Sequence, residues 1–146
     1  MESDRFFDFI RSGYVEPWKP ESRVQNEVVM QTIAGAAAAY AQAGYFTIVD
    51  GIVLPRFFFE PLRDALHGSG QPVAYAVLRA PLDACLSRAG ARETQAPGDP
   101  HVVERLWHDF ADLGPLSAHA VDLDAHDPEE AADLLEARLR DGSLRA

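Results

Sequence analysis

Apolar residues recur along much of the chain at the three-to-four residue spacing of an amphipathic helix. The longest such stretch covers residues 21–43 and predicts a helix that ends at Gly44, with an apolar side formed by Val24, Val28, Val29, Ile33, Ala36, Ala37 and Tyr40. Shorter patterns predict helices over residues 4–11, 56–66, 81–89, 100–113 and 128–140.

Three short apolar runs lie between these helical patterns. They cover residues 45–49, 73–78 and 118–123, each of strand length. Helices that alternate with short buried strands predict a three-layer α/β fold, in which a parallel sheet has helices on both faces. We expect one domain over residues 1–146, since no linker divides the chain, with a polar, Gly- and Pro-containing mobile loop over residues 90–100.

Composition and charge exclude several classes of protein. The acidic, aromatic start of the sequence does not resemble a signal peptide, and no apolar run has the length of a membrane span. A single cysteine, Cys85, fits a reducing cytoplasm. The net charge of −10 disfavours binding to nucleic acid, because an acidic surface repels phosphates.

The residues that follow predicted strands are the first candidates for chemistry, because ligands of open α/β sheets bind beyond the carboxyl ends of the strands. Asp50 follows the run 45–49 directly and could hold magnesium or its water shell; alternatively it only begins a turn with Gly51. Arg79 follows the run 73–78.

Arginines stand out at this predicted edge. Arg88 and Arg92 lie four residues apart and so on one face of a helix, and with Arg79 they could neutralise a polyphosphate. The alternative is that these arginines form surface salt bridges with Asp83 and Glu93.

Asp4 precedes the first predicted helix. It either caps that helix or accepts a proton from a substrate hydroxyl, and the residues alone leave both readings open. The five histidines and Cys85 show no ligand spacing, so we expect no structural zinc site.

Several short runs, in this order, resemble small P-loop kinases, in particular the chloramphenicol phosphotransferase-like and zeta-toxin-like AAA-type ATPases. The runs are Glu2-Ser3-Asp4-Arg5-Phe6-Phe7, Pro20-Glu21-Ser22 with Gln25-Asn26, Ile48-Val49-Asp50-Gly51-Ile52, and Val77-Leu78-Arg79-Ala80-Pro81 with Arg88. The resemblance spans nearly the whole chain.

The resemblance implies an ATP- and magnesium-dependent kinase that phosphorylates a hydroxyl group of a small molecule. Asp4 matches the general base, and Asp50 matches the acid at the end of a strand that holds magnesium. Arg88 and Arg92 match the arginines of a lid, whose mobile part would be residues 90–100. The remaining implied contacts are to nucleotide (Asp50, Arg79, Arg88, Asp124) and to the acceptor (Arg5, Phe6, Trp18, Arg23, Asn26).

The chain departs from the family in one essential motif. The phosphate-binding loop G-x-x-x-x-G-K-[ST] is absent, and the only lysine, Lys19, lies between prolines and does not begin a helix. We therefore expect that the loop precedes Met1, because the reading frame was started at an internal methionine or the chain was truncated. Without it we expect no catalysis, and exposed sheet edges that favour homo-oligomers. The alternative is a non-catalytic module that binds an anion or a partner.

Overall fold

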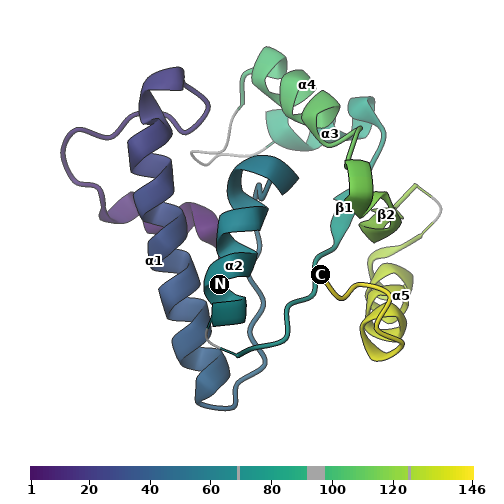
Figure 1. Cartoon of the computed structure of the whole chain (residues 1–146). Helices are drawn as coiled ribbons and strands as arrows, with labels where there is room; N and C mark the ends of the chain where they lie inside the picture. Colours follow the sequence, from purple (N-terminus) through teal and green to yellow (C-terminus); the bar gives the residue numbers. More distant parts are fainter. Residues whose placement is uncertain (69, 92–97, 125) are drawn as a thin grey trace. The chain divides into compact units, whose positions relative to one another are not determined.

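A computed structural model describes residues 1–68, 70–91, 98–124 and 126–146. The chain forms two compact units, Met1–Val73 and Ala74–Ala146, which we describe separately (Figure 1). The prediction of one domain over residues 1–146 stays a prediction. Most of the predicted mobile loop over residues 90–100, and Arg92 within it, lies outside the described residues.

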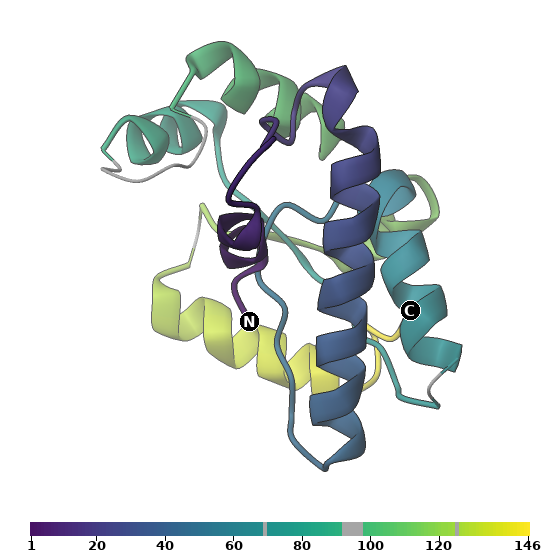
Figure 2. The same cartoon turned by 90° about the vertical axis from the view of Figure 1, so that its left-hand side faces the viewer.

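The first unit is built on two helices that lie side by side, α1 (Arg23–Gln42) and α2 (Glu60–Gly68) (Figures 1 and 2). Two short 3-10 helices precede α1, η1 (Ser3–Phe9) and η2 (Pro20–Ser22), and a π-helical turn, η3 (Pro55–Phe59), leads into α2. Apolar side chains of these elements form the core of the unit: Val29, Met30, Ile33, Ala34, Ala37, Val53, Phe58, Phe59 and Leu62.

The predicted helix over 21–43 is confirmed, with a 3-10 turn at its start. Gly44 ends it in the left-handed conformation, with φ at 89°. The predicted apolar side is only partly right: Val29, Ile33 and Ala37 are buried, whereas Val24 and Val28 are 70% and 56% exposed. The helix uses a narrower apolar face than the periodicity indicates.

The predicted strand over 45–49 is wrong. These residues form no helix or strand, and their chain pairs with residues 1–3 only through an isolated parallel bridge between Glu2 and Asp50. A strand needs a ladder of hydrogen bonds to a neighbour, and here the neighbour is a single short segment.

The second unit holds the two-stranded parallel sheet, β1 (Val77–Arg79) and β2 (Ala120–Asp122). Val77, Leu78 and Arg79 pair with Ala120, Val121 and Asp122. The helices of this unit are α3 (Leu82–Gly90), α4 (Pro100–Asp109) and α5 (Pro128–Arg140), with a 3-10 helix, η4 (Gly114–His119), before β2.

The helices of the second unit begin where the sequence predicts, because local signals mark their starts. Pro100 and Pro128 occupy first-turn positions, and Asp99 and Asp127 accept hydrogen bonds from the backbone N–H groups that follow. The indole of Trp107 on α4 donates to the carbonyl of Ala80, 2.9 Å away, and so ties α4 to the start of α3.

The predicted three-layer parallel sheet is wrong. Helical segments make up 59% of the structure, and the part of the chain described here contains one two-stranded sheet. Two of the three apolar runs do contribute strands, but shorter ones. Ala74 in the second run pairs antiparallel with Arg145, and the start of the third run belongs to η4. Among the described residues, no helix has the length and apolar character needed to cross a membrane.

Candidate functional site

The strongest candidate site lies where the start of the chain meets residues 48–50. The amide of Ser3 donates to the carbonyl of Asp50 at 2.7 Å, and the amide of Asp50 donates to the carbonyl of Met1 at 2.9 Å. Because the two segments run parallel, their carboxyl ends point the same way. Asp4 and Asp50, two predicted site residues, therefore leave the pair at the same end.

A close backbone approach holds this pair together. A Cβ atom added to Gly51 would lie 1.7 Å from Oγ and 2.8 Å from Cβ of Ser3, a separation that real atoms do not reach. Ser3 itself is 3% exposed. Gly51 is therefore required by space, and this explains why a glycine follows Asp50 in the run Ile48–Ile52.

Both carboxylates of the candidate site are exposed to solvent. The hydroxyl of Ser3 donates to Asp4 over a long 3.5 Å, and neither acid has an ion-pair partner within the described ranges. Two accessible carboxylates are suited to accept a proton or to bind a hydrated cation. They form no cluster of three or more His, Cys, Asp or Glu residues of the kind that could hold a metal ion, as far as the described residues go.

The residues predicted to contact the acceptor share the first unit with these two acids. Arg5 forms exposed ion pairs with Glu2 at 3.0 Å and with Asp8 at 3.9 Å, and Arg23 pairs with Glu27 at 3.1 Å. Each of these pairs is formed within one helical turn and is solvated. Phe6 and Trp18 are half-buried. The two arginines are therefore accessible to a ligand but already have charge partners.

Asn26 has a structural position at the start of α1. It is 1% exposed, and its Nδ2 donates to the carbonyl of Pro17 at 2.8 Å and to Oγ of Ser22 at 2.9 Å. The adjacent Gln25 exchanges two hydrogen bonds with the backbone of Val15. These side chains hold the loop before η2 against α1. Oδ1 of Asn26 is buried and has no partner among the described residues.

Lys19 is engaged in the same loop. Its ammonium lies 2.8 Å from the carboxylate of Glu16, and this hydrogen-bonded pair raises the pKa of Lys19 and lowers that of Glu16. Lys19 lies at the start of η2, a three-residue 3-10 helix. The expectation that Lys19 does not begin a helix is wrong, because Lys19 is the N-cap residue of η2, which is followed directly by α1.

The predicted nucleotide contacts Arg79, Arg88 and Asp124 lie in the second unit. The guanidinium of Arg79 donates to both carboxylate oxygens of Asp122 on β2, at 2.9 and 3.3 Å. The sequence leaves open surface salt bridges between the arginines and Asp83 or Glu93; Arg79 does form a salt bridge, but its partner is Asp122. Arg88 near the end of α3 and Asp124 after β2 are both exposed. Arg92 lies outside the described residues.

The structure also shows buried polar residues that the sequence pattern does not single out. Ser3 and Ser22 are 3% and 1% exposed. In the second unit, Nδ1 of His119 lies 2.8 Å from the carbonyl of Tyr75, and both residues are buried. Burial raises the pKa of the Tyr75 phenol to about 12. No spacing in the sequence links residues 75 and 119, so only the fold could reveal this pair.

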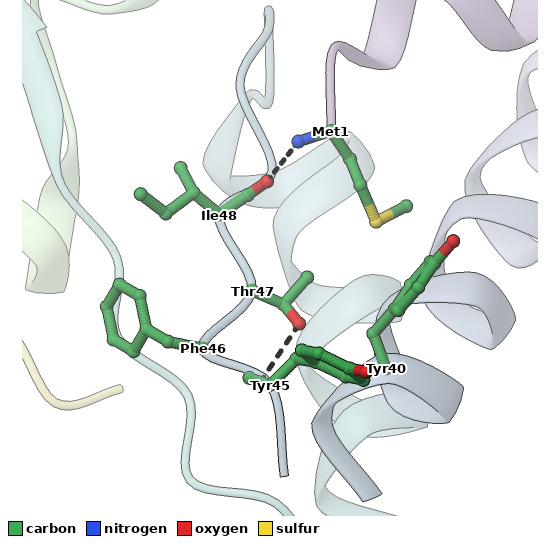
Figure 3. A pocket seen from close by; sticks show the side chains of 6 residues that line it. All are labelled: Met1, Tyr40, Tyr45, Phe46, Thr47 and Ile48. Carbon is green, nitrogen blue, oxygen red and sulfur yellow. Dashed lines mark hydrogen bonds between the residues drawn. The ribbon is translucent and has the colours of Figure 1, made fainter. Parts of the chain in front are cut away.

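A shallow hollow of about 260 Å³ lies beside the candidate site in the first unit (Figure 3). Its lining residues are Met1, Tyr40, Tyr45, Phe46, Thr47 and Ile48. Phe46 and Ile48 project to one side of the 45–48 backbone, and Met1 lies with the rings of Tyr40 and Tyr45 on the other side. The hollow contains no charged side chain.

Comparisons with known proteins found no match, so the functional assignment rests on the residues described above. No protein-family model matches the chain, and no curated protein matches it.

Proposed function

We propose that the chain provides the acceptor side of an ATP-dependent phosphotransferase, which transfers the γ-phosphate to a hydroxyl group of a small molecule. The observation that carries the proposal is the parallel pairing of residues 1–3 with residues 48–50, which brings Asp4 and Asp50 out at one end of the pair. The order of the kinase-like runs along the chain supports the same reaction and the relationship to small P-loop kinases.

Asp4 has the properties of a general base in this proposal. Its carboxylate is exposed and forms no ion pair within the described ranges, so it is available to accept the proton of an incoming hydroxyl group. The neighbouring Arg5 and the half-buried Phe6 and Trp18 would then position the acceptor, which presents both polar and apolar groups.

Asp50 fits one part of a magnesium site. It supplies a single exposed carboxylate, which suits an ion that keeps most of its water ligands. The chemistry that magnesium supplies when bound is neutralisation of phosphate charge.

The residues present do not fit the triphosphate of ATP. The sequence has no glycine-rich phosphate-binding loop, Lys19 is paired with Glu16, and Arg79 is paired with Asp122. We therefore propose that the phosphate-binding loop comes from outside this sequence, and that the chain alone transfers no phosphate.

The alternative function is that of a non-catalytic module that binds an anion or a partner. The exposed Arg88, which forms no ion pair within the described ranges, favours anion binding. The exposed apolar residues at 45–48 favour a protein partner. With either function we place the protein in the cytoplasm, because its single cysteine, Cys85, is a free thiol.

The two functions are distinguished by comparing this chain with an extended chain that includes the upstream residues encoded by the in-frame DNA. Binding of magnesium-ATP is measured by calorimetry for this chain and for the extended chain, and phosphate transfer is measured with a set of hydroxylated compounds. We expect the extended chain to bind and transfer, and this chain to do neither.

An Asp4→Asn variant of the extended chain tests the proposed base. It should still bind magnesium-ATP but lose transfer by about 100-fold or more. Glu60→Gln, at an exposed acid on α2 that has no role in the proposed site, serves as the control and should keep its activity. Absence of transfer by the unmodified extended chain, or upstream DNA without a Gly-rich G-K-[ST] loop, would contradict the proposal.

A further inference from the structure

The chain contains two Asp-Gly pairs, Asp50-Gly51 and Asp141-Gly142. In such a pair the glycine nitrogen can close a five-membered ring with the carboxyl carbon of the preceding aspartate, and glycine has no Cβ to shield that nitrogen. The two pairs share this chemistry but differ in how the fold holds their reacting groups. The structure therefore distinguishes a pair that reacts from a pair that is protected.

Asp50 and Gly51 present their reacting groups to solvent. Both residues are exposed, and among the described residues the carboxylate of Asp50 accepts no hydrogen bond and the amide of Gly51 donates none. The backbone carbonyl of Asp50 accepts from the amide of Ser3, but this pairing is an isolated bridge and not a ladder. Local opening that frees the carbonyl therefore costs little, and the Asp50 side chain can then swing onto the Gly51 nitrogen.

The close contact between Gly51 and Ser3 keeps a glycine after Asp50. A Cβ atom at position 51 would lie 1.7 Å from Oγ of Ser3. A side chain at this position is the change that would most directly shield the nitrogen, and the contact with Ser3 excludes it. The geometry that joins residues 1–3 to residues 48–50 therefore also preserves the reactive pair.

Asp141 and Gly142 have their reacting groups held by hydrogen bonds. The carboxylate of Asp141 accepts from the amide of Ser143 at 2.8 Å, and the amide of Gly142 donates to the carbonyl of Leu139 at 3.3 Å. Hydrogen bonding from Ser143 lowers the pKa of Asp141, which keeps its carboxylate in the ionised form that a nucleophile attacks less readily. Both reacting groups must therefore break a bond before a ring can close.

We propose that Asp50 is a site of spontaneous isoaspartate formation, in which the Gly51 nitrogen attacks the side-chain carboxyl carbon of Asp50, whereas Asp141 resists the same reaction. The bond from the nitrogen to Cγ forms as the nitrogen loses its proton, and one carboxyl oxygen leaves as water with that proton and one from solvent. A second water molecule opens the ring, and the carboxyl group that is released returns a proton to solvent. Cleavage between the nitrogen and Cγ restores aspartate, whereas cleavage between the nitrogen and the backbone carbonyl carbon leaves the chain running through Cβ.

The isomer changes the candidate site at its backbone and at its carboxylate. The former backbone carbonyl of residue 50, which accepts from the amide of Ser3, becomes a free carboxylate, and the main chain gains one atom before Gly51. The carboxylate of residue 50 thereby leaves the position that it holds at the same end of the pair as Asp4. Loss of the magnesium acid rests on the proposed function, whereas the isomerisation itself requires neither nucleotide nor acceptor.

The test follows the uptake of oxygen-18 from water into each Asp-Gly pair. The folded chain is incubated for weeks at neutral pH in enriched water, digested in ordinary water and mapped by mass spectrometry. Each ring opening adds one oxygen-18 atom to the aspartate, and electron-transfer fragmentation distinguishes isoaspartate from aspartate. We expect uptake at Asp50 to exceed uptake at Asp141 by about tenfold or more, with isoaspartate detected at position 50.

Two controls assign the difference to the fold and to ring closure. In urea that unfolds the chain, the two pairs should react at rates within about twofold of each other, because the bonds that restrain Asp141 are lost. Asp50→Glu keeps a carboxylate but requires a six-membered ring, so uptake at position 50 should fall by about tenfold or more while uptake at Asp141 stays unchanged. Circular dichroism confirms that the variant is folded, and the comparison within the unmodified chain does not depend on it.

Three results would overturn the proposal. They are equal uptake at Asp50 and Asp141 in the folded chain, an excess at Asp50 that persists in urea, and undiminished uptake at position 50 in Asp50→Glu. The first would show that the bonds around Asp141 do not restrain it, and the second that the neighbouring sequence sets the difference. None of these readouts depends on phosphate transfer, so failure here leaves the kinase proposal to its own test.

Discussion

At the scale of single residues, Gly51 is the glycine where an added side chain meets the closest contact. Its Cα faces the buried Ser3 so closely that a Cβ would overlap the hydroxyl. We expect Gly51→Ala to lower the free energy of unfolding by about 1–3 kcal/mol, because Ser3 and the 48–50 segment must move apart. Urea denaturation followed by circular dichroism measures this change.

Gly35 provides the control for that substitution. It lies in the middle of α1, is exposed, and has no atom within 4 Å of an added Cβ. Gly35→Ala should therefore raise stability by about 0.5–1 kcal/mol, since alanine favours the helix. Equal effects of the two substitutions would show that the close approach at Ser3 does not exist.

Tyr75 gives a prediction about alkaline pH. Burial raises its pKa from 10.0 to about 12, so the folded protein holds the phenol proton more tightly than the unfolded chain does. The corresponding stabilisation is complete below pH 10 and is lost as the pH rises toward 12. As the pH is raised, tyrosinate absorbance should increase in a late phase that Tyr75→Phe removes. If Tyr75→Phe instead removes absorbance that develops at or below pH 10, the assignment is contradicted.

At the scale of elements, the start of α5 combines the clearest signals in the chain. The carboxylate of Asp127 accepts from the amides of Glu129 and Glu130, and Glu130 returns a bond to the amide of Asp127. Asp127→Ala should cost about 1 kcal/mol of stability through loss of this capping box. Asp99→Ala, which removes a single bond to the amide of His101, should cost less in the same denaturation assay. A larger cost for Asp99→Ala would contradict the reciprocal cap.

Most of the helices could be predicted from the sequence because their determinants are local, but the predicted helix over residues 4–11 is the 3-10 helix η1, and the one over 56–66 begins as the π-helical turn η3. Periodic apolar residues, Pro100 and Pro128 near helix starts, and Gly44 after α1 all act within a few residues. The strands could be predicted only in part, because a strand exists only if a distant segment pairs with it. Residues 45–49 have strand composition but pair only at their end, through the bridge at Asp50.

The candidate site was predictable to a similar degree. Asp50 was identified by its place after a predicted strand and Asp4 by its place before a predicted helix, and the structure brings their segments together. The bond partners of Arg79 and Asn26 were not predictable, since Asp122 and the carbonyl of Pro17 are distant in sequence or belong to the backbone.

At the scale of the whole molecule, helix dominates. The far-ultraviolet circular dichroism spectrum should therefore have the paired negative bands of a helical protein, with a helical content no higher than about 59%, because that share of the described residues includes the 3-10 and π-helical segments. A spectrum that requires the strand content of an ordinary α/β domain, about 20–25%, would contradict the two-stranded sheet. Spectra at several protein concentrations control for added strands that form by self-association.

The bond from the Met1 amino group to the carbonyl of Ile48 has a practical consequence for all of these measurements. A purification tag fused ahead of Met1 would convert this charged ammonium into an amide, as the upstream residues of the extended chain would, whereas a tag after Ala146 would leave it unchanged. The end of the protein that carries the tag is therefore an experimental variable, and binding or stability data from the two tagged forms are not interchangeable.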